Sequence, residues 1–127
     1  MGALGAKLRT VGGGLVAFWC PGCDEAHNLR PRIEGAPSPS WEFNGDGDRP
    51  TFSPSVLVTC GHYVSSFKPG DSCWCTYNAE HPERPSHAQC GRCHSYVRNG
   101  EIQFLADSTH ALAGQTVPLP DWPQGRY

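Results

Sequence analysis

The polar and apolar residues of this chain alternate in short segments that are typical of β-strands. Residues 15–19 form a continuous apolar run, which predicts a buried strand. Residues 26–33 predict a weaker strand interrupted by Pro31, and residues 51–59 predict an extended segment. Pro54 favours an edge position for that segment, because proline cannot donate a hydrogen bond to a neighbouring strand.

Turn-forming residues separate these segments. The clearest hairpin joins residues 95–98 to residues 101–105 through Asn99-Gly100. Both turn residues tolerate the positive φ angles of a type I′ turn. Asn44-Gly45 gives a similar turn signal after the alternating residues 41–43.

The other segments predict little regular structure. Three prolines fall between residues 69 and 85, so we expect residues 60–89 to be a loop-rich insertion. Residues 108–113 predict one helical turn, with Ser108 or Thr109 as its cap and Gly114 as its end. Residues 1–13 are a candidate flexible tail. The fold class is therefore mainly β: a single domain over residues 1–127, with long loops and at most one short helix.

Composition narrows the class of protein. A chain of 127 residues suits one domain, and its 15 glycines and 12 prolines interrupt every candidate helix, which excludes a helical bundle. No apolar run approaches the roughly 18 residues that a membrane-spanning helix needs, so we expect no membrane partner. A formal net charge of −2 gives no general electrostatic reason to expect nucleic-acid binding.

Seven cysteines and six histidines point to metal binding. An odd number of cysteines cannot complete a disulfide framework. Lys7 and Arg9 precede an apolar stretch, but three consecutive glycines break it and no cleavage site follows, so we expect a reducing cytoplasm rather than secretion. In that compartment, clustered cysteines are typical of metal ligands. Structural zinc would compensate for a core that is short of large aliphatic residues.

Two Cys-x-x-Cys units predict the first zinc site. Cys20 and Cys23 form one unit, and Cys90 and Cys93 form the other. This spacing lets a tight turn direct two thiolates at one tetrahedral ion, as in the two knuckles of a zinc ribbon. Here 66 residues separate the units, whereas roughly 15–20 are usual. The fold is thus expected to be a zinc-stabilised, zinc-ribbon-like domain.

One zinc ion is expected, and four further residues could complete a second tetrahedral site: Cys60, His62, Cys73 and Cys75. Other partitions stay open at this point. His27 can replace a cysteine in the first site. Cys75 can join Cys90 and Cys93, which leaves the first knuckle with His27, His94 or His110. Cys93 and His94 are neighbours and would point to opposite faces of a strand, so we do not expect them to bind the same ion.

Two segments of the chain resemble known metal-binding motifs only in part. Residues 44–48 resemble the start of a calcium loop, but Arg49 and Ser55 occupy the positions of its glycine and glutamate, which favours a polar turn. His81 and Glu83 before the second Cys-x-x-Cys unit resemble a zinc deaminase, but too few residues separate the two parts for that fold.

The sequence also resembles a family of small uncharacterised proteins of tailed bacteriophages and prophages. The segments that carry the resemblance are Phe18-Trp19-Cys20-Pro21-Gly22-Cys23, Trp41-Glu42-Phe43-Asn44-Gly45-Asp46, Pro50-Thr51-Phe52-Ser53-Pro54-Ser55, Cys93-His94-Ser95-Tyr96-Val97 and His110-Ala111-Leu112-Ala113-Gly114-Gln115-Thr116-Val117. The resemblance implies a phage-encoded protein that lies in the host cytoplasm or is associated with the virion, and it brings no established activity. It further implies a first zinc site built on Cys20, Cys23 and Cys93.

These observations favour a structural-zinc protein without catalytic residues. Thiolate-rich sites with four protein ligands leave no open position for water. The expected function is a binding module for a host protein or a virion component. One alternative is a zinc-dependent hydrolase with an open metal site near His94, His110 or Glu83. The second alternative is a nucleic-acid-binding zinc ribbon.

Overall fold

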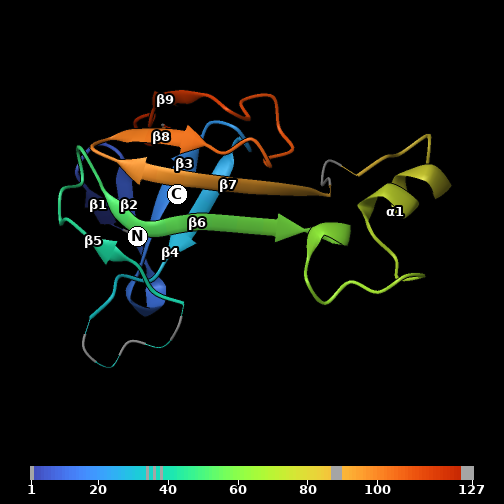
Figure 1. Cartoon of the computed structure of the whole chain (residues 1–127), viewed down its shortest axis with the longest axis horizontal. Coiled ribbons are helices and arrows are strands. Elements are labelled where there is room, and N and C mark those ends of the chain that lie inside the picture. The colour runs from blue at the N-terminus through green and yellow to red at the C-terminus, as the bar shows by residue number, and fades with distance from the viewer. Residues whose placement is uncertain (1, 34, 36, 38, 87–89, 124–127) are drawn as a thin grey trace.

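The computed structural model describes the chain except residues 1, 34, 36, 38, 87–89 and 124–127 (Figure 1). The first of its two sheets is antiparallel, with strand order β1-β2-β3-β4. Its strands are β1 (Gly2–Leu4), β2 (Leu8–Val11), β3 (Leu15–Cys20) and β4 (Glu25–Leu29). A short 3₁₀ turn, η1 (Gly12–Gly14), joins β2 to β3.

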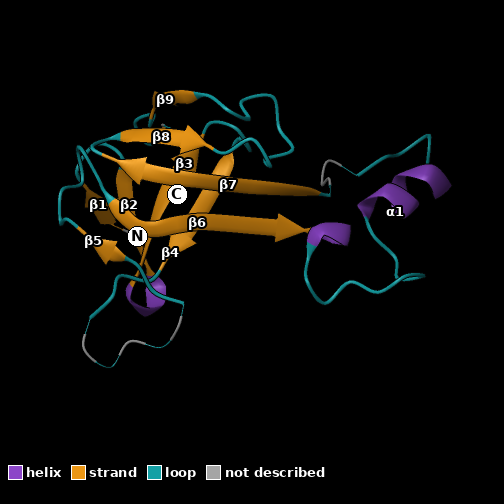
Figure 2. Cartoon of the chain, in the orientation of Figure 1, coloured by secondary structure: helices purple, strands orange, loops and turns teal. Residues whose placement is uncertain are grey.

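The second sheet is also antiparallel, with strand order β5-β6-β7-β8-β9. Its strands are β5 (Glu42–Phe43), β6 (Phe52–Cys60), β7 (Gly91–Arg98), β8 (Glu101–Phe104) and β9 (Thr116–Pro118). The helical elements between β6 and β7 are the 3₁₀ turn η2 (Gly61–Tyr63) and the helix α1 (Trp74–Glu80). The described residues confirm the expected mainly β fold and contain one short α-helix. Figure 2 shows the strands in orange and the helical segments, 3₁₀ turns included, in purple.

The two sheets pack face to face around one apolar core. Phe18 of β3 and Leu29 of β4 come from the first sheet, and Phe52, Val97 and Phe104 come from the second. All five are buried, because alternate residues of each strand point inward. β3 and β4 lie behind β6 and β7 in Figure 1, so the inner faces meet. Because both sheets bury their inner faces in the same core, a modest number of large apolar residues is enough to hold the two sheets together.

The β7–β8 hairpin forms as its sequence predicts. Asn99 and Gly100 have φ angles of 51° and 79°, and Arg98 pairs with Glu101 on either side of them. Two successive positive φ angles are the requirement of a type I′ turn.

Strand β6 has an irregular first half. Its pairing with β7 shifts register between Phe52 and Val56, and Pro54 lies within this stretch. On the other side, β5 pairs with Phe52 and Ser53 alone. Among the residues that the structure describes, β6 from Pro54 onward therefore has a strand neighbour on one side, which agrees with the edge position expected for Pro54.

Two local expectations were wrong. The segment expected as a flexible tail, residues 1–13, contributes β1 and β2, because the fully buried Leu8 pairs with Phe18 and anchors β2 in the core. Residues 108–113 form turns rather than a helix. There the N–H of Gly114 donates to the carbonyl of Phe104 at 3.0 Å, which returns the chain to β8 instead of continuing a helix.

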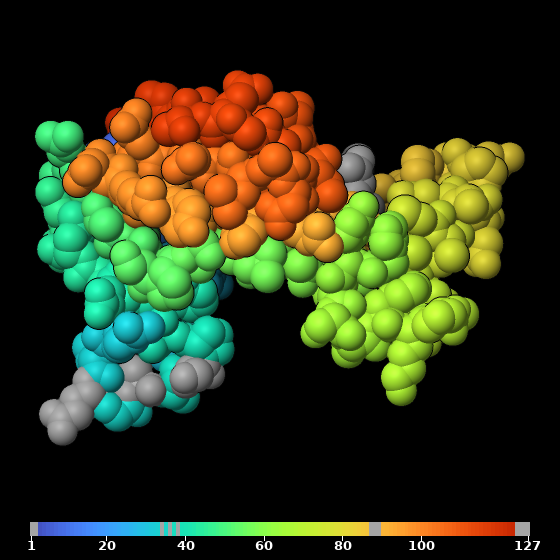
Figure 3. Space-filling view, in the orientation of Figure 1, coloured from blue at the N-terminus to red at the C-terminus, as the bar shows by residue number. Residues whose placement is uncertain are grey.

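The helix lies in the segment expected to be loop-rich. Cys73 precedes α1 and its N–H donates to Oγ1 of Thr76 at 2.9 Å, while its own side chain accepts from the backbone at Thr76. This reciprocal capping satisfies donors at the start of the helix. Residues 61–86 project beyond the ends of β6 and β7 (Figures 1 and 3). No helix within the described residues is long and apolar enough to cross a bilayer.

Replacing Phe18 tests the shared core. We expect Phe18→Ala to lower the free energy of unfolding by about 3–5 kcal/mol, because it leaves a cavity between the two sheets. Urea denaturation followed by tryptophan fluorescence measures the change. Ile33→Ala is the control, since Ile33 is 71% exposed and its loss should cost less than about 0.5 kcal/mol. Equal destabilisation by the two variants would contradict a core between the sheets.

Candidate functional site

Three polar side chains form a hydrogen-bonded chain on the outer face of the second sheet. Oγ of Ser55 lies 3.0 Å from Nε2 of His94. On the other side of the ring, Nδ1 of His94 lies 3.1 Å from Oδ2 and 3.3 Å from Oδ1 of Asp107. The Asp107 carboxylate favours a proton on Nδ1, so Nε2 is left as the acceptor for the Ser55 hydroxyl.

Strand alternation places these side chains together. Val56 on β6 and Ser95 on β7 pair with each other and are buried, so their neighbours Ser55 and His94 point away from the core. His94 pairs directly with Leu57, which puts Ser55 at the diagonal position on the same face. The hydroxyl and the imidazole therefore meet across two strands although 39 positions separate them in the sequence.

Ser108 joins the histidine strand to the turn that carries Asp107. Its buried hydroxyl accepts from the N–H of His94 at 3.0 Å and donates to the His94 carbonyl at 3.1 Å. The N–H of Leu105 donates to the same carbonyl at 2.8 Å. Both backbone groups of His94 are thus held by the segment that follows β8, so the imidazole and the carboxylate keep their relative positions.

A surface groove of about 600 Å³ lies beside Ser55. Its lining residues come from β6 and from the loop before β5: Arg32, Pro39, Ser40, Trp41, Pro54, Ser55 and Leu57. Nε1 of Trp41 donates to the Ser55 carbonyl at 3.1 Å and fixes the backbone there. The groove therefore contains Ser55, and the His94 side chain beside that serine is 25% exposed.

This arrangement is that of an activated serine nucleophile. An imidazole hydrogen-bonded to the hydroxyl removes its proton, and a carboxylate on the other ring nitrogen orients the ring and stabilises its charged form. Sequence reasoning missed this site. It considered His94 only as a metal ligand or as part of a zinc enzyme, Ser55 only as a calcium-loop position, and Asp107 not at all, since no local spacing connects the three residues.

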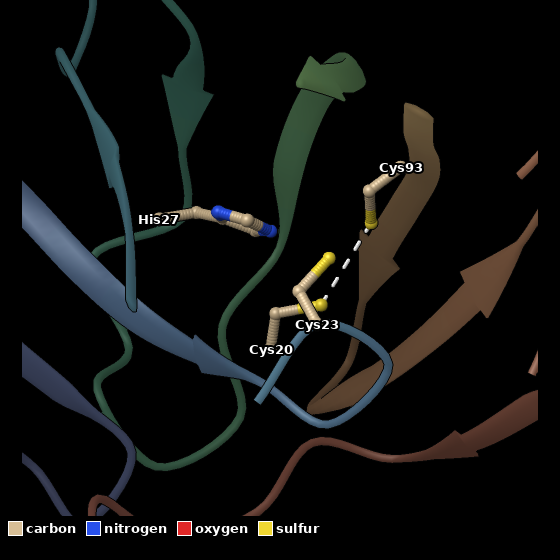
Figure 4. Close-up of side chains that lie close together, drawn as sticks. All are labelled: Cys20, Cys23, His27 and Cys93. Carbon is tan, nitrogen blue, oxygen red and sulfur yellow. Dashed lines mark hydrogen bonds between the residues drawn. The ribbon is translucent and has the colours of Figure 1, made fainter. Parts of the chain in front are cut away.

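A first Cys/His cluster lies on the opposite, buried side of β7. Its members are Cys20, Cys23, His27 and Cys93, whose ligand atoms all lie within 4.8 Å of one another (Figure 4). Cys20 ends β3, Cys23 follows in a tight turn, and His27 lies on β4, whereas Cys93 lies on β7. The cluster therefore connects the two sheets. The Sγ atoms of Cys20 and Cys93 are 3.7 Å apart.

The chemistry of this cluster suits a cation. Hydrogen bonds from the thiols of Cys23 and Cys93 lower the pKa of Cys20. The hydrogen bond between Cys20 and Cys23 raises the pKa of the Cys23 thiol to about 12. Hydrogen bonds to Cys20 and Cys23 also raise the pKa of the Cys93 thiol. A second buried thiolate is disfavoured unless a positive charge lies between the sulfurs. Among the described residues, none hydrogen-bonds to the buried Nε2 of His27, which leaves that nitrogen available as a ligand.

A second cluster lies where the projecting segment leaves the sheet. Its members are His62 of η2, Cys73 and Cys75 at the start of α1, and Cys90 just before β7, again within 4.8 Å of one another. It is more exposed than the first cluster. Desolvation opposes ionisation of Cys90, but hydrogen bonds from the backbone of His62 and Cys75 outweigh it and lower the pKa of Cys90 to about 6. Hydrogen bonds to Cys73 and Cys90 raise the pKa of His62.

The grouping of the expected ligands differs from the zinc-ribbon arrangement. Cys90 and Cys93 belong to different clusters, because the chain between them is already extended as β7 rather than folded into a knuckle. Three residues of strand span about 10 Å, too far for both sulfurs to bind one ion. His27 takes the fourth position of the first cluster, and Cys90 takes the place expected for Cys60 in the second. Cys60 belongs to neither cluster and lines a cavity of about 670 Å³ between them.

His110 lies against the first knuckle instead of within a cluster. Its ring packs edge-on against Phe104 with centroids 4.4 Å apart, and its Nδ1 accepts from the N–H of Leu112 at 3.2 Å. The ring also lies directly against Gly22, so that a Cβ at this position would overlap it. His110 thus supports the turn between Cys20 and Cys23 by packing.

Comparison with known proteins gives one family. The model of the BubE family, described as "Bacterial ubiquitination-like system serine protease", matches residues 6–105. This range contains Ser55 and His94, and Asp107 follows two positions after its end. No curated protein and no solved structure matches the chain. The description of the family implies protein partners.

This match overturns the resemblance to a phage family. The phage origin, the association with a virion and the role as a binding module for host or virion proteins were therefore wrong, as were the zinc hydrolase and the nucleic-acid-binding ribbon. The segments that carried the resemblance include residues 50–55 and 93–97, which position Ser55 and His94. Those segments are informative, but they indicate a bacterial serine protease family.

The contact between Gly22 and His110 can be tested by adding one methyl group. We expect Gly22→Ala to lower the free energy of unfolding by about 1–3 kcal/mol, because the new Cβ displaces the ring. Thermal melting checks this against Gly12→Ala, whose Cβ would meet nothing within 4 Å. In the double variant with His110→Ala, the penalty of Gly22→Ala should largely disappear. Identical melting of the two glycine variants would refute the packing role of His110.

Proposed function

The chain belongs to the BubE family, and on that premise we propose that it is a serine protease with Ser55 as its nucleophile. His94 acts as the general base and Asp107 orients it. The observation that carries this proposal is the continuous hydrogen-bonded path from the Ser55 hydroxyl through both ring nitrogens of His94 to the Asp107 carboxylate. The path supplies a nucleophile, a base and an anion in the order that a catalytic triad requires.

The mechanism follows from the positions of these atoms. Oγ of Ser55 attacks the substrate carbonyl carbon while its proton passes to Nε2 of His94. The Asp107 carboxylate accepts from the Nδ1 N–H and stabilises the imidazolium. His94 then gives the proton to the leaving amine, and the C–N bond breaks to leave an acyl group on Ser55. A water molecule, deprotonated by the same ring, hydrolyses that ester and restores the serine.

The substrate is a protein amide. The description of the family assigns its members to a bacterial ubiquitination-like system. We therefore expect the cleaved bond to belong to a protein component of such a system. The open groove beside Ser55 supports this, since a macromolecular substrate must approach the hydroxyl from the surface.

Each Cys/His cluster, we further propose, holds a structural zinc ion. Cys20, Cys23, His27 and Cys93 would hold one ion, and His62, Cys73, Cys75 and Cys90 would hold the other. Three thiolates and one imidazole are a common donor set of closed, tetrahedral zinc sites. Zinc in the first site would connect β3, β4 and β7 directly behind His94. The ions would stabilise the fold, and the reaction would use Ser55, His94 and Asp107 alone.

Replacing the nucleophile tests the proposed activity. We expect an alkyl fluorophosphonate to modify the wild-type protein once, at Ser55, as read by intact mass and peptide mapping. Ser55→Ala should abolish this labelling and lower peptide hydrolysis by at least about 10³-fold, because the attacking oxygen is gone. Ser53→Ala is the matched control on the same strand and should be labelled at the wild-type rate. Labelling or hydrolysis that survives in Ser55→Ala would disprove the assignment.

Metal content tests the two clusters separately. Native mass spectrometry of the wild-type protein should show two zinc ions. We expect Cys20→Ser to lose one ion and to melt far below the wild type, since that site joins the two sheets. Cys75→Ser should lose the other ion with a smaller shift, because it anchors only the projecting segment. Cys60→Ser is the control and should keep both ions. A metal-free wild-type protein, or loss of an ion in Cys60→Ser, would count against the proposal.

A further inference from the structure

One edge of β6 runs away from Ser55 without a strand beside it. β5 pairs only with Phe52 and Ser53, and β7 occupies the opposite edge from Val56 to Cys60. Within the described part of the chain, residues 56–59 therefore have no strand beside them on the side of the groove. None of these four residues is charged, although sheets usually protect exposed edges with charged side chains. An uncharged edge that begins directly after the proposed nucleophile is suited to pairing with another chain.

The hydrogen bonds of β7 show which backbone groups of β6 face this edge. Both backbone groups of His94 are bonded on the β8 side, to Ser108 and Leu105. In an antiparallel ladder, such a residue forms a non-hydrogen-bonded pair with its partner on the other strand. The partner of His94 is Leu57, so the N–H and C=O of Leu57 point away from β7 and toward the free edge.

The same reasoning applies two residues further along. The N–H and C=O of Arg92 are both bonded to Thr109, at 2.9 Å in each case. Its partner Thr59 therefore also presents its backbone groups to the free edge. The carbonyl of Ser55 faces that side as well, where it accepts from Nε1 of Trp41. Beyond Ser55, whose carbonyl is already bonded, Leu57 and Thr59 thus offer donors and acceptors at alternate residues, which is the pattern that an added strand requires.

An apolar surface accompanies these backbone groups. The Leu57 side chain is 55% exposed and lines the groove together with Trp41 and Pro54. A large exposed leucine next to a catalytic serine is suited to contact a substrate side chain, because burial of its surface would then favour binding.

We propose that an extended segment of the protein substrate binds as an additional strand along the free edge of β6. It pairs with the backbone groups of Leu57 and Thr59 and places an apolar side chain against Leu57 and Trp41. This inference rests on the proposed function of Ser55 and identifies the form in which the substrate is recognised. Main-chain pairing provides affinity in this mode, and the side-chain contact provides specificity.

Leu57→Pro tests the pairing most directly. Proline removes the N–H that faces the free edge and leaves the ladder to β7 intact, because Leu57 makes no hydrogen bond to His94. Leu57→Thr is the matched variant, which keeps the N–H and loses the apolar side chain. The substrate is a mixture of tryptic peptides from a bacterial proteome, with products identified by mass spectrometry. The fluorophosphonate labelling rate of Ser55 reports whether the folded catalytic residues are intact.

We expect Leu57→Pro to reduce peptide cleavage at least about tenfold while its labelling rate stays within about twofold of the wild type. Leu57→Thr should retain more activity and lose the preference for an apolar residue at a fixed distance from the cleavage site. Thr59→Pro should repeat the effect of Leu57→Pro at the second position. If Leu57→Pro cleaves peptides at the wild-type rate, strand pairing is refuted. If Leu57→Pro loses cleavage and labelling together, the catalytic residues are disturbed and Thr59→Pro decides: wild-type cleavage by that variant refutes strand pairing.

Two other outcomes separate this proposal from its alternatives. A wild-type dimer that Leu57→Pro dissociates, as measured by size-exclusion chromatography, would show that a second copy of the chain occupies the edge and would overturn substrate pairing. Absence of labelling at Ser55 in the wild-type protein would instead disprove the proposed function. A labelled wild-type protein that cleaves none of the peptides would refute strand pairing alone.

Discussion

The alternation of neighbouring side chains along β7 is the constraint on which this structure depends. Cys93 points into the core, where it meets Cys20, Cys23 and His27, and His94 points outward to Ser55 and Asp107. A single peptide bond thus connects a buried thiol cluster to the candidate catalytic base. Because a shift of one residue in the β6–β7 register would exchange these faces, both sites require the same pairing of Leu57 with His94.

This arrangement also explains how a domain with few large apolar residues keeps its proposed catalytic residues in position. The shared core holds the sheets together over the middle of the strands, with Phe18 against the second sheet. The first Cys/His cluster connects the sheets at the end of β3 and near the start of β7, and its residues Cys20 and Cys93 are part of the same buried core. An ion bound there would fix the position of β7 relative to β3 and β4. The buried hydroxyl of Ser108 bonds both backbone groups of His94. The strand that carries the imidazole is therefore held by Ser108 as well as by the neighbouring Cys93 in the cluster.

Local signals in the sequence account for what could be predicted. The apolar residues 15–19 and the Asn99-Gly100 turn specify a strand and a hairpin through short-range preferences, and both occur as expected. Cys20 and Cys23 also lie together because a tight turn joins them. The corresponding pair, Cys90 and Cys93, does not lie together, because the chain between them is extended as β7. The sequence pattern Cys-x-x-Cys alone does not distinguish a tight turn from a strand. The tail and the helix at residues 108–113 were mispredicted for a related reason: contacts with distant residues, such as Leu8 with Phe18, decide these segments.

The candidate active site lies beyond such signals. Ser55 and His94 are 39 positions apart, and Asp107 follows His94 by 13 positions. Only the sheet register brings them within hydrogen-bonding distance, and register is a property of the whole second sheet. The sequence did predict one element of the answer, because adjacent residues on a strand cannot serve one site and Cys93 and His94 had to be separated. Assigning Cys93 to the metal cluster leaves His94 on the solvent side, facing a serine hydroxyl. The two proposed roles, metal binding and nucleophilic catalysis, are therefore consequences of the same strand geometry.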